Sequence, residues 1–229
     1  MPAKKKAPED LSAKKALALE VIDRLKKEYP DAGCTLDYDH AWQLLVSVRL
    51  AAQCTDARVN IVVEDLFAQY PNVAALAAAK PEDIEAIVKP CGLGHSKARD
   101  ISACMRMLRD KYNCQVPTTF EELLALPGVG RKSANLIMGD VFGKPAIVTD
   151  THCIRLCNKI GLVDGIKEPQ KVEMALWKII PPEEGSDLCH RFVMHGRAVC
   201  NARKPECERC CLKDLCRFAR ETAAQSTEH

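Results

Sequence analysis

The stretch LPGVGRK at residues 126–132 decides how the rest of the chain is interpreted. Before it, Thr119 and Glu122 form a capping-box pattern, in which threonine and glutamate side chains satisfy the free amides that begin a helix. After it, apolar residues recur at helical spacing from Arg131 to Phe142. The sequence therefore predicts a helix, a glycine-rich turn and a second helix, which is the helix-hairpin-helix pattern.

The glycines of this turn predict an anion site. Gly128 and Gly130 are expected to adopt backbone angles that other residues avoid, and they leave room for a close approach. The N–H groups around Val129, with the start of the second helix, would suit a DNA phosphate, and Arg131 would add positive charge. An ordinary turn with a helix-stopping glycine is the alternative. Many non-enzymatic DNA-binding proteins share this hairpin, so it does not by itself predict an enzyme.

Lys132 is the candidate nucleophile. It falls in the first turn of the second helix, where the positive end of the helix dipole disfavours a charged ammonium. An unprotonated amine there can attack the sugar C1′ of a nucleotide, expel the base and leave a Schiff base. The alternative is a lysine that contacts phosphate, as most lysines near DNA do.

Asp150, in the segment VTDTH at 148–152, favours the catalytic interpretation of Lys132. It follows an apolar run and precedes a predicted helix, so it is also expected to be the N-cap of that helix. Its carboxylate would stabilise the cationic sugar that forms as a base leaves, and would help to deprotonate Lys132. The two roles are compatible.

Four of the 13 cysteines form the array C-x6-C-x2-C-x5-C within residues 200–216. Four thiolates at this spacing can enclose a [4Fe-4S] cluster in one compact loop. Zinc is the alternative, although zinc sites usually present two close pairs and this array has one. Cys211 adjoins the array, and we choose Cys210 because it keeps the spacing. The predicted ligands are Cys200, Cys207, Cys210 and Cys216.

The composition limits the remaining classes. The 229 residues are 47% hydrophobic and 28% charged, and the net charge is only +2. Residues 191–220 hold eight lysines or arginines against three acids, so a local basic face that includes Arg203 and Lys204 is expected. Apolar runs are too short for a membrane span, and no signal-peptide pattern opens the sequence. We expect no membrane partner and a monomeric, cytoplasmic, nucleoid-associated protein.

Helical periodicity recurs along the whole chain, with turn residues between the segments, and no β alternation competes with it. Ser96 is expected to cap one of these helices. The fold is predicted to be all-α. Besides the hairpin, the expected helices are 11–28, 39–52, 55–70, 81–92, 96–112, 151–160, 168–179 and 185–198.

Taken together, these motifs resemble endonuclease III, the iron–sulfur branch of the helix-hairpin-helix DNA glycosylases. The similarity spans about residues 11–218, and the ordered combination of motifs is far more specific than any one of them. The segments that carry it are AQCTD (52–56), GLGHSKA (92–98), LPGVGRK (126–132), VTDTH (148–152), HGR (195–197) and the cysteine array.

The resemblance implies two helical domains with the active site in the cleft between them. The continuous domain, about 34–146, would hold the hairpin. The second domain would combine 11–33 with 147–229 and carry a [4Fe-4S] cluster. Residues 1–10, which include a lysine run, are expected to be a flexible basic tail.

The resemblance also assigns residue roles. Lys132 would be the Schiff-base nucleophile and Asp150 the activating carboxylate. Gln53 and Leu93 match loop positions that fill the gap or wedge the stack when a nucleotide is flipped out. Without the family, Gln53 would be a polar helix end and Leu93 an inward-packing leucine. His152 is a candidate DNA-cleft residue, with a structural histidine as the alternative.

The implied activity is removal of oxidised pyrimidines from double-stranded DNA, followed by cleavage at the abasic site through β-elimination. Ser133 and Asp140 depart from the family's usual threonine and asparagine, and Gly94-His95 alters the wedge loop. Two rivals remain. A monofunctional, adenine-removing relative is disfavoured by Lys132 and the short C-terminal segment. A catalytically idle, redox-responsive DNA-binding protein would share the hairpin and cluster, and a lyase assay separates it.

Overall fold

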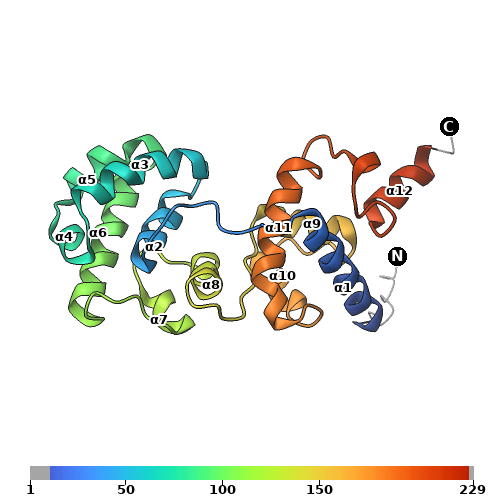
Figure 1. The fold of residues 1–229 in the computed structure, drawn as a ribbon, viewed down its shortest axis with the longest axis horizontal. Coiled ribbons are helices and arrows are strands. Elements are labelled where there is room, and N and C mark those ends of the chain that lie inside the picture. Colours follow the sequence, from blue (N-terminus) through green and yellow to red (C-terminus); the bar gives the residue numbers. More distant parts are fainter. Residues whose placement is uncertain (1–10, 227–229) are drawn as a thin grey trace, which may run out of the picture. The chain divides into compact units, whose positions relative to one another are not determined.

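The computed structural model describes residues 11–226, and every regular element in that range is a helix (Figure 1). The all-α prediction is therefore confirmed for this part of the chain. The predicted basic tail, residues 1–10, lies outside the described residues. The described residues divide into two compact units, one formed by residues 34–144 and one by residues 11–33 together with residues 145–226.

The unit of residues 34–144 (the hairpin unit) packs its helices around one apolar core. Helices α4 and α5 both pack on the long helix α6, which buries Ile101, Met105 and Leu108. Helices α7 and α8 contact each other, and α8 also packs on α2. The helices are α2 (Ala41–Leu50), α3 (Asp56–Gln69), α4 (Val73–Ala78), α5 (Pro81–Val88), η1 (Lys89–Cys91), α6 (Gly94–Lys111), α7 (Phe120–Ala125) and α8 (Arg131–Asp140).

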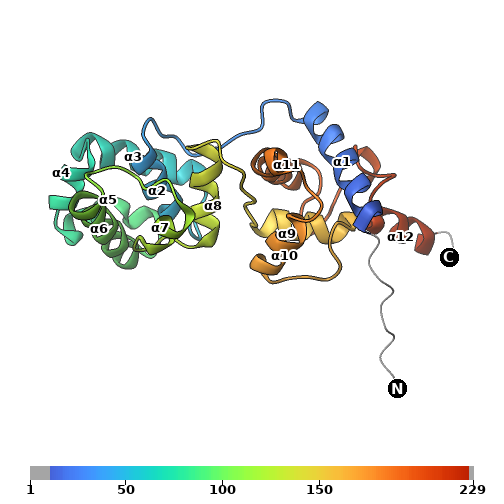
Figure 2. The same cartoon turned by 90° about the horizontal axis from the view of Figure 1, so that it is seen from below.

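The other unit (the cysteine unit) is discontinuous in sequence. Helix α11 packs against both α9 and α1, which brings the N-terminal helix beside C-terminal segments (Figure 2). Phe192 of α11 is fully buried in this packing. The helices are α1 (Leu11–Glu28), α9 (Thr151–Ile160), α10 (Pro169–Leu176), η2 (Pro182–Glu184), α11 (Gly185–Ala198), η3 (Cys207–Arg209) and α12 (Arg217–Ser226).

The start of α6 corrects one prediction. The N-cap is Leu93, in a left-handed conformation, and not Ser96. The Ser96 hydroxyl lies inside the first turn and donates a hydrogen bond to the Leu93 carbonyl oxygen at 3.1 Å. Helix α12 is absent from the predicted helices. Helix α4 is absent too, because it has only six residues and its apolar run resembles many buried segments.

Within residues 11–226, no helix combines the length and the apolar character that a membrane span requires.

Candidate active site

The predicted helix-hairpin-helix is present as α7, a turn over residues 126–130, and α8. Thr119 is the N-cap of α7, and its hydroxyl donates to a Glu122 carboxylate oxygen at 2.6 Å. Within the turn, the Val129 amide donates to the Leu126 carbonyl oxygen at 3.1 Å. Val129 is half-buried, so it fixes the turn onto the unit and does not project freely from it.

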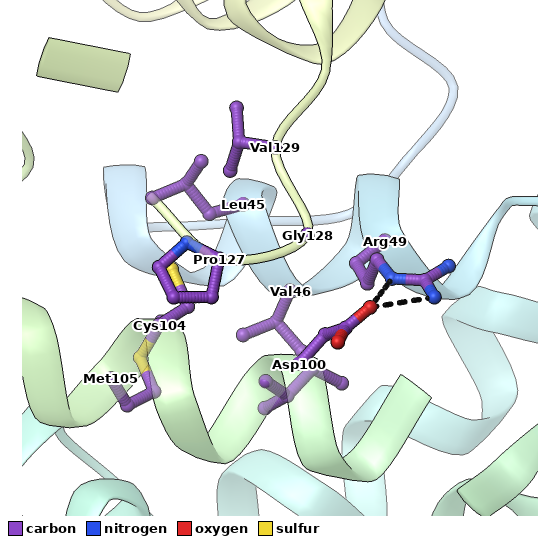
Figure 3. A pocket seen from close by; sticks show the side chains of 10 residues that line it. Leu45, Val46, Arg49, Asp100, Cys104, Met105, Pro127, Gly128 and Val129 are labelled. Carbon is purple, nitrogen blue, oxygen red and sulfur yellow. Dashed lines mark hydrogen bonds and ion pairs between the residues drawn. The ribbon is translucent and has the colours of Figure 1, made fainter. Parts of the chain in front are cut away.

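Gly128 sits directly on an ion pair from two other helices (Figure 3). Its φ of +75° is one that glycine adopts readily. A Cβ atom there would lie 2.9 Å from Asp100 Cβ and 3.1 Å from Arg49 Cδ. Arg49 Nε and Nη2 donate to the same Asp100 oxygen, at 2.9 and 2.8 Å. The pair therefore forms the floor of the turn, and sequence reasoning missed it because its members are 51 residues apart.

Gly130 differs from the expectation for its backbone. Its φ is −98° and its ψ is 177°, which is ordinary extended backbone that any residue adopts. A Cβ at Gly130 would meet no other atom within 4 Å. The prediction that this glycine is needed for its backbone angles is wrong. Its remaining distinctive property is the open space beside the start of α8.

The start of α8 has no side-chain cap. Gly130 occupies the N-cap position and cannot offer an oxygen to the amides of the first turn. Helices α3, α4 and α9 contrast with it, because Thr55, Asn72 and Asp150 cap them through side-chain oxygens. The start of α8 therefore lacks the N-cap side-chain acceptor that these three helices have, and the helix dipole favours an anion as an acceptor there.

Two basic side chains follow these amides. The guanidinium of Arg131 stacks over the Phe120 ring, with 4.9 Å between Cζ and the ring centroid. Lys132, the second residue of α8, is exposed. Stacking holds the arginine against α7, while the lysine side chain projects from the helix start.

Replacing Gly128 with alanine is expected to weaken binding to duplex DNA by about tenfold or more. The added methyl group would push the turn away from the side chains of Arg49 and Asp100. Gly143 provides a matched control, since its φ is +59° but a Cβ there meets nothing within 4 Å. Gly143→Ala should add comparable backbone strain and leave affinity within about twofold. Fluorescence anisotropy with a labelled duplex measures both variants. Equal losses of affinity would show that the packing of the turn on Arg49 and Asp100 does not contribute to DNA binding.

Gln53 and Leu93 occupy two exposed turns of the hairpin unit. Both are non-glycine residues in the left-handed region, with φ of 58° and 51°. Leu93 is 56% exposed although it is a large apolar side chain. Left-handed backbone costs on the order of 1–3 kcal/mol for such residues and persists only where the surroundings enforce it. The alternative, in which Leu93 packs inward, is wrong, and its exposure is what a wedging residue requires.

In the cysteine unit, Asp150 is the N-cap of α9, as predicted. Its Oδ1 accepts a hydrogen bond from the Cys153 amide at 2.7 Å. His152 is half-buried, and its ring lies against Gly196 of α11, where a Cβ atom would collide with it. Arg155 Nη2 lies 3.2 Å from His152 Nδ1 and donates to the Cys200 carbonyl oxygen at 2.9 Å. These contacts explain the glycine of the HGR segment as a packing requirement.

The four predicted cluster ligands, Cys200, Cys207, Cys210 and Cys216, line one cavity, and Cys211 is not part of that lining. Among residues 11–226, no three cysteine, histidine or acidic side chains converge closely enough for one metal ion. Zinc requires four ligands at about 2.0–2.3 Å from a single centre. A cubane cluster binds each thiolate to a different iron, so thiols spread around a cavity fit it better.

His195 is a residue whose role sequence reasoning missed, although it lies in the HGR segment. It is buried, and its Nδ1 lies 3.0 Å from the Tyr29 hydroxyl while its Nε2 lies 3.3 Å from Cys210 Sγ. Burial raises the pKa of Tyr29 to about 12, so this hydroxyl keeps its proton. The tautomer with its proton on Nε2 accepts from Tyr29 and donates to the sulfur, and so connects α1 to the cysteine loop.

Arg203 and Lys204 are both exposed in the loop that precedes η3. The Lys204 amide donates to Asn201 Oδ1 at 2.7 Å, and the Glu206 amide donates to the Val199 carbonyl oxygen at 3.0 Å. These bonds hold the loop backbone, and the two basic side chains project from it toward solvent.

Comparison with known proteins identifies the family. A model described as HhH-GPD superfamily base excision DNA repair protein matches residues 46–182. Endonuclease III of Synechocystis sp. is 43% identical over 207 residues, which cover 90% of this chain and 94% of that protein. Endonuclease III of Escherichia coli K12 is 38% identical over 204 residues, with 89% and 96% covered.

The solved structures agree. A trapped covalent intermediate of endonuclease III with DNA, an estranged-adenine complex, superposes on this chain with a TM-score of 0.86. The two sequences are 41% identical, and the match covers 91% of this chain and 98% of that one.

Proposed function

The chain belongs to the HhH-GPD superfamily of base excision DNA repair proteins and, within it, to the endonuclease III family; on this premise we propose that it removes oxidised pyrimidines through a Lys132 Schiff base. It is a DNA N-glycosylase that also acts as a lyase at abasic sites. The observation that carries the residue assignment is an exposed lysine in the first turn of α8, a helix whose N-cap residue is glycine.

The hairpin binds the phosphate backbone of DNA. Amides at the start of α8 donate hydrogen bonds to a phosphate oxygen, and the helix dipole favours the negative charge. Gly130 leaves room for the phosphate. Because Gly128 has no side chain, the turn can pack closely on the Arg49–Asp100 pair. Because phosphate contacts release counterions, affinity for duplex DNA should fall steeply as salt increases.

Lys132 supplies the chemistry at the sugar. Its neutral amine bonds to C1′ while the glycosidic bond breaks and the bonding electron pair leaves with the base. Opening of the sugar ring and loss of the amine proton give the Schiff base. Removal of a C2′ proton then expels the 3′ phosphate oxygen and breaks the strand. Asp150 is assigned the carboxylate that stabilises the developing positive charge.

The substrate is double-stranded DNA with a damaged pyrimidine or an abasic site. Gln53 and Leu93 are assigned to the space that a flipped nucleotide leaves, which fits their exposure on strained turns. His152 is assigned to the DNA-facing surface of α9, and its contact with Gly196 fixes the ring there. We assign the active form to a monomer.

Cys200, Cys207, Cys210 and Cys216 are the residues that would hold a [4Fe-4S] cluster, since all four line one cavity. When bound, the cluster supplies a structural cross-link and takes no part in the reaction at the sugar. The loop with Arg203 and Lys204 lies between the first and second of these cysteines. Holding its ends together presents both cations toward phosphate.

Cys210→Ser is expected to reduce bound iron and to weaken duplex binding by about tenfold, because the basic loop loses an anchor. Cys211→Ser is the matched control, since Cys211 is adjacent but does not line the cavity. It should retain full iron content and affinity. Iron analysis, visible absorbance and anisotropy measure these properties. If the Cys211 variant lost iron and the Cys210 variant kept it, the ligand assignment would be reversed.

The test of the function is borohydride trapping on duplex DNA that carries one thymine glycol or one abasic site. We expect a covalent adduct on both substrates. An adduct on the abasic site alone would retain the lyase and redirect the search to other bases. No adduct on either, with DNA binding intact, would favour the monofunctional or the non-catalytic alternative.

A further inference from the structure

Lys97 is a fully buried lysine on α6. Its ammonium donates hydrogen bonds to two backbone carbonyl oxygens, those of Leu50 and Cys91, each at 2.8 Å. Burial lowers the pKa of this ammonium, which reflects the cost of removing the charge from water. A buried charge is retained against that cost only where its hydrogen bonds are strong, and a cation bound to carbonyl groups meets this condition.

The two carbonyls belong to two different turns. Leu50 ends α2, and the turn after it contains Gln53. Cys91 ends η1, and Leu93 follows two residues later. One ammonium therefore joins the bases of the two exposed, left-handed turns.

A second contact connects the same turns. The Cys54 side chain is an electrostatic neighbour of the Cys91 thiol. Burial, reinforced by the neighbouring Cys54 thiol, raises the pKa of Cys91 to about 11, so this thiol stays protonated. The bases of the two turns are thus packed on each other as well as joined by Lys97.

We propose that Lys97 is a positioning residue that fixes the Gln53 and Leu93 turns relative to each other, so that both side chains enter a DNA duplex together. The inference rests on the proposed function, because it assumes that these two side chains replace a flipped nucleotide. The strained backbone of both turns needs a rigid support, and the Lys97 ammonium provides one support for both.

The position of Lys97 explains why the side chain is a lysine. It shares one face of α6 with Ile101 and Leu108, which are fully buried, so an apolar residue would be expected there. An apolar side chain would leave the Leu50 and Cys91 carbonyls without this donor. The four-carbon stem crosses the apolar layer, and the ammonium offers more than one N–H at its end.

Hydrogen exchange on the DNA-free protein tests whether Lys97 holds the two turns in place. Lys97→Met keeps the apolar stem and removes the donors, and we expect amides of residues 51–55 and 92–96 to exchange on the order of tenfold faster. Lys97→Gln, which keeps an N–H donor, should give a smaller increase. Leu108→Ala is the control for lost stability in the same helix, and it should not accelerate these two segments selectively. Unchanged exchange in Lys97→Met, or equal acceleration in Leu108→Ala, would overturn the proposal.

Activity on a duplex and on a single-stranded substrate then tests whether this positioning helps to open the duplex. On a thymine glycol within a duplex, Lys97→Met should release base about tenfold or more slowly, because the duplex must be opened and held. On an abasic site in single-stranded DNA, trapping should stay within about twofold of wild type. Equal losses on both substrates would overturn the positioning role. If the wild-type protein formed no adduct at all, the proposed function would fail, whereas wild-type activity with an unaffected Lys97→Met would remove this inference alone.

Discussion

Replacing Lys132 with glutamine is expected to abolish the borohydride-trapped adduct and to slow base release by at least about a thousandfold. The amide nitrogen of glutamine cannot form a Schiff base, because its lone pair is delocalised into the carbonyl group. Glutamine has a similar length and helix propensity, so α8 should still begin at Arg131. Single-turnover assays on a thymine glycol duplex measure base release, and denaturing gels measure the adduct.

Binding separates the nucleophile from a phosphate-contacting lysine. The Lys132 variant should bind a duplex within about threefold of wild type, since one lost charge contributes little beside the hairpin amides. Lys111→Gln, which removes an exposed lysine from the last turn of α6, controls for the change in net charge. A large loss of affinity with residual adduct would place Lys132 among the phosphate contacts, and the nucleophile would be another amine.

Sequence reasoning succeeds here wherever local chemistry decides the structure. The all-α fold follows from recurring helical periodicity with turn residues between segments. The position of the hairpin follows from LPGVG, and the cap at Asp150 follows from an aspartate placed between an apolar run and a helix. Each of these features depends on residues within one or two turns of each other, which is the range over which a sequence pattern is informative.

The features that sequence reasoning missed depend on partners distant in the chain. The Arg49–Asp100 floor beneath Gly128 joins two helices, and nothing near either residue indicates the other. Lys97 is buried because two carbonyls converge on it, and that convergence exists only in the folded unit. Serine is a residue type that often caps helices, so the sequence favours Ser96, but the unusual left-handed backbone at Leu93 begins the helix earlier.

Asp150 offers a test in which the two roles of one carboxylate are separated. As the N-cap of α9 it uses Oδ1, which accepts from the Cys153 amide. Asparagine keeps an oxygen at that position and is an equally good cap. In this chain Asn72 already caps α4 in that way, by accepting from the Ala75 amide at 2.9 Å. Asp150→Asn should therefore leave the free energy of unfolding within about 0.5 kcal/mol of wild type.

The same variant should lose activity, because the negative charge that the mechanism requires is gone. We expect base release to fall by about a hundredfold to ten-thousandfold. Asp150→Ala should fall as far and also lose about 1 kcal/mol of stability, since it removes the cap. Thermal melts and single-turnover kinetics on both variants measure the two quantities independently. An active Asp150→Asn beside an inactive, destabilised Asp150→Ala would show that the residue serves the chain only as a cap, and Lys132 would then need another source of charge stabilisation.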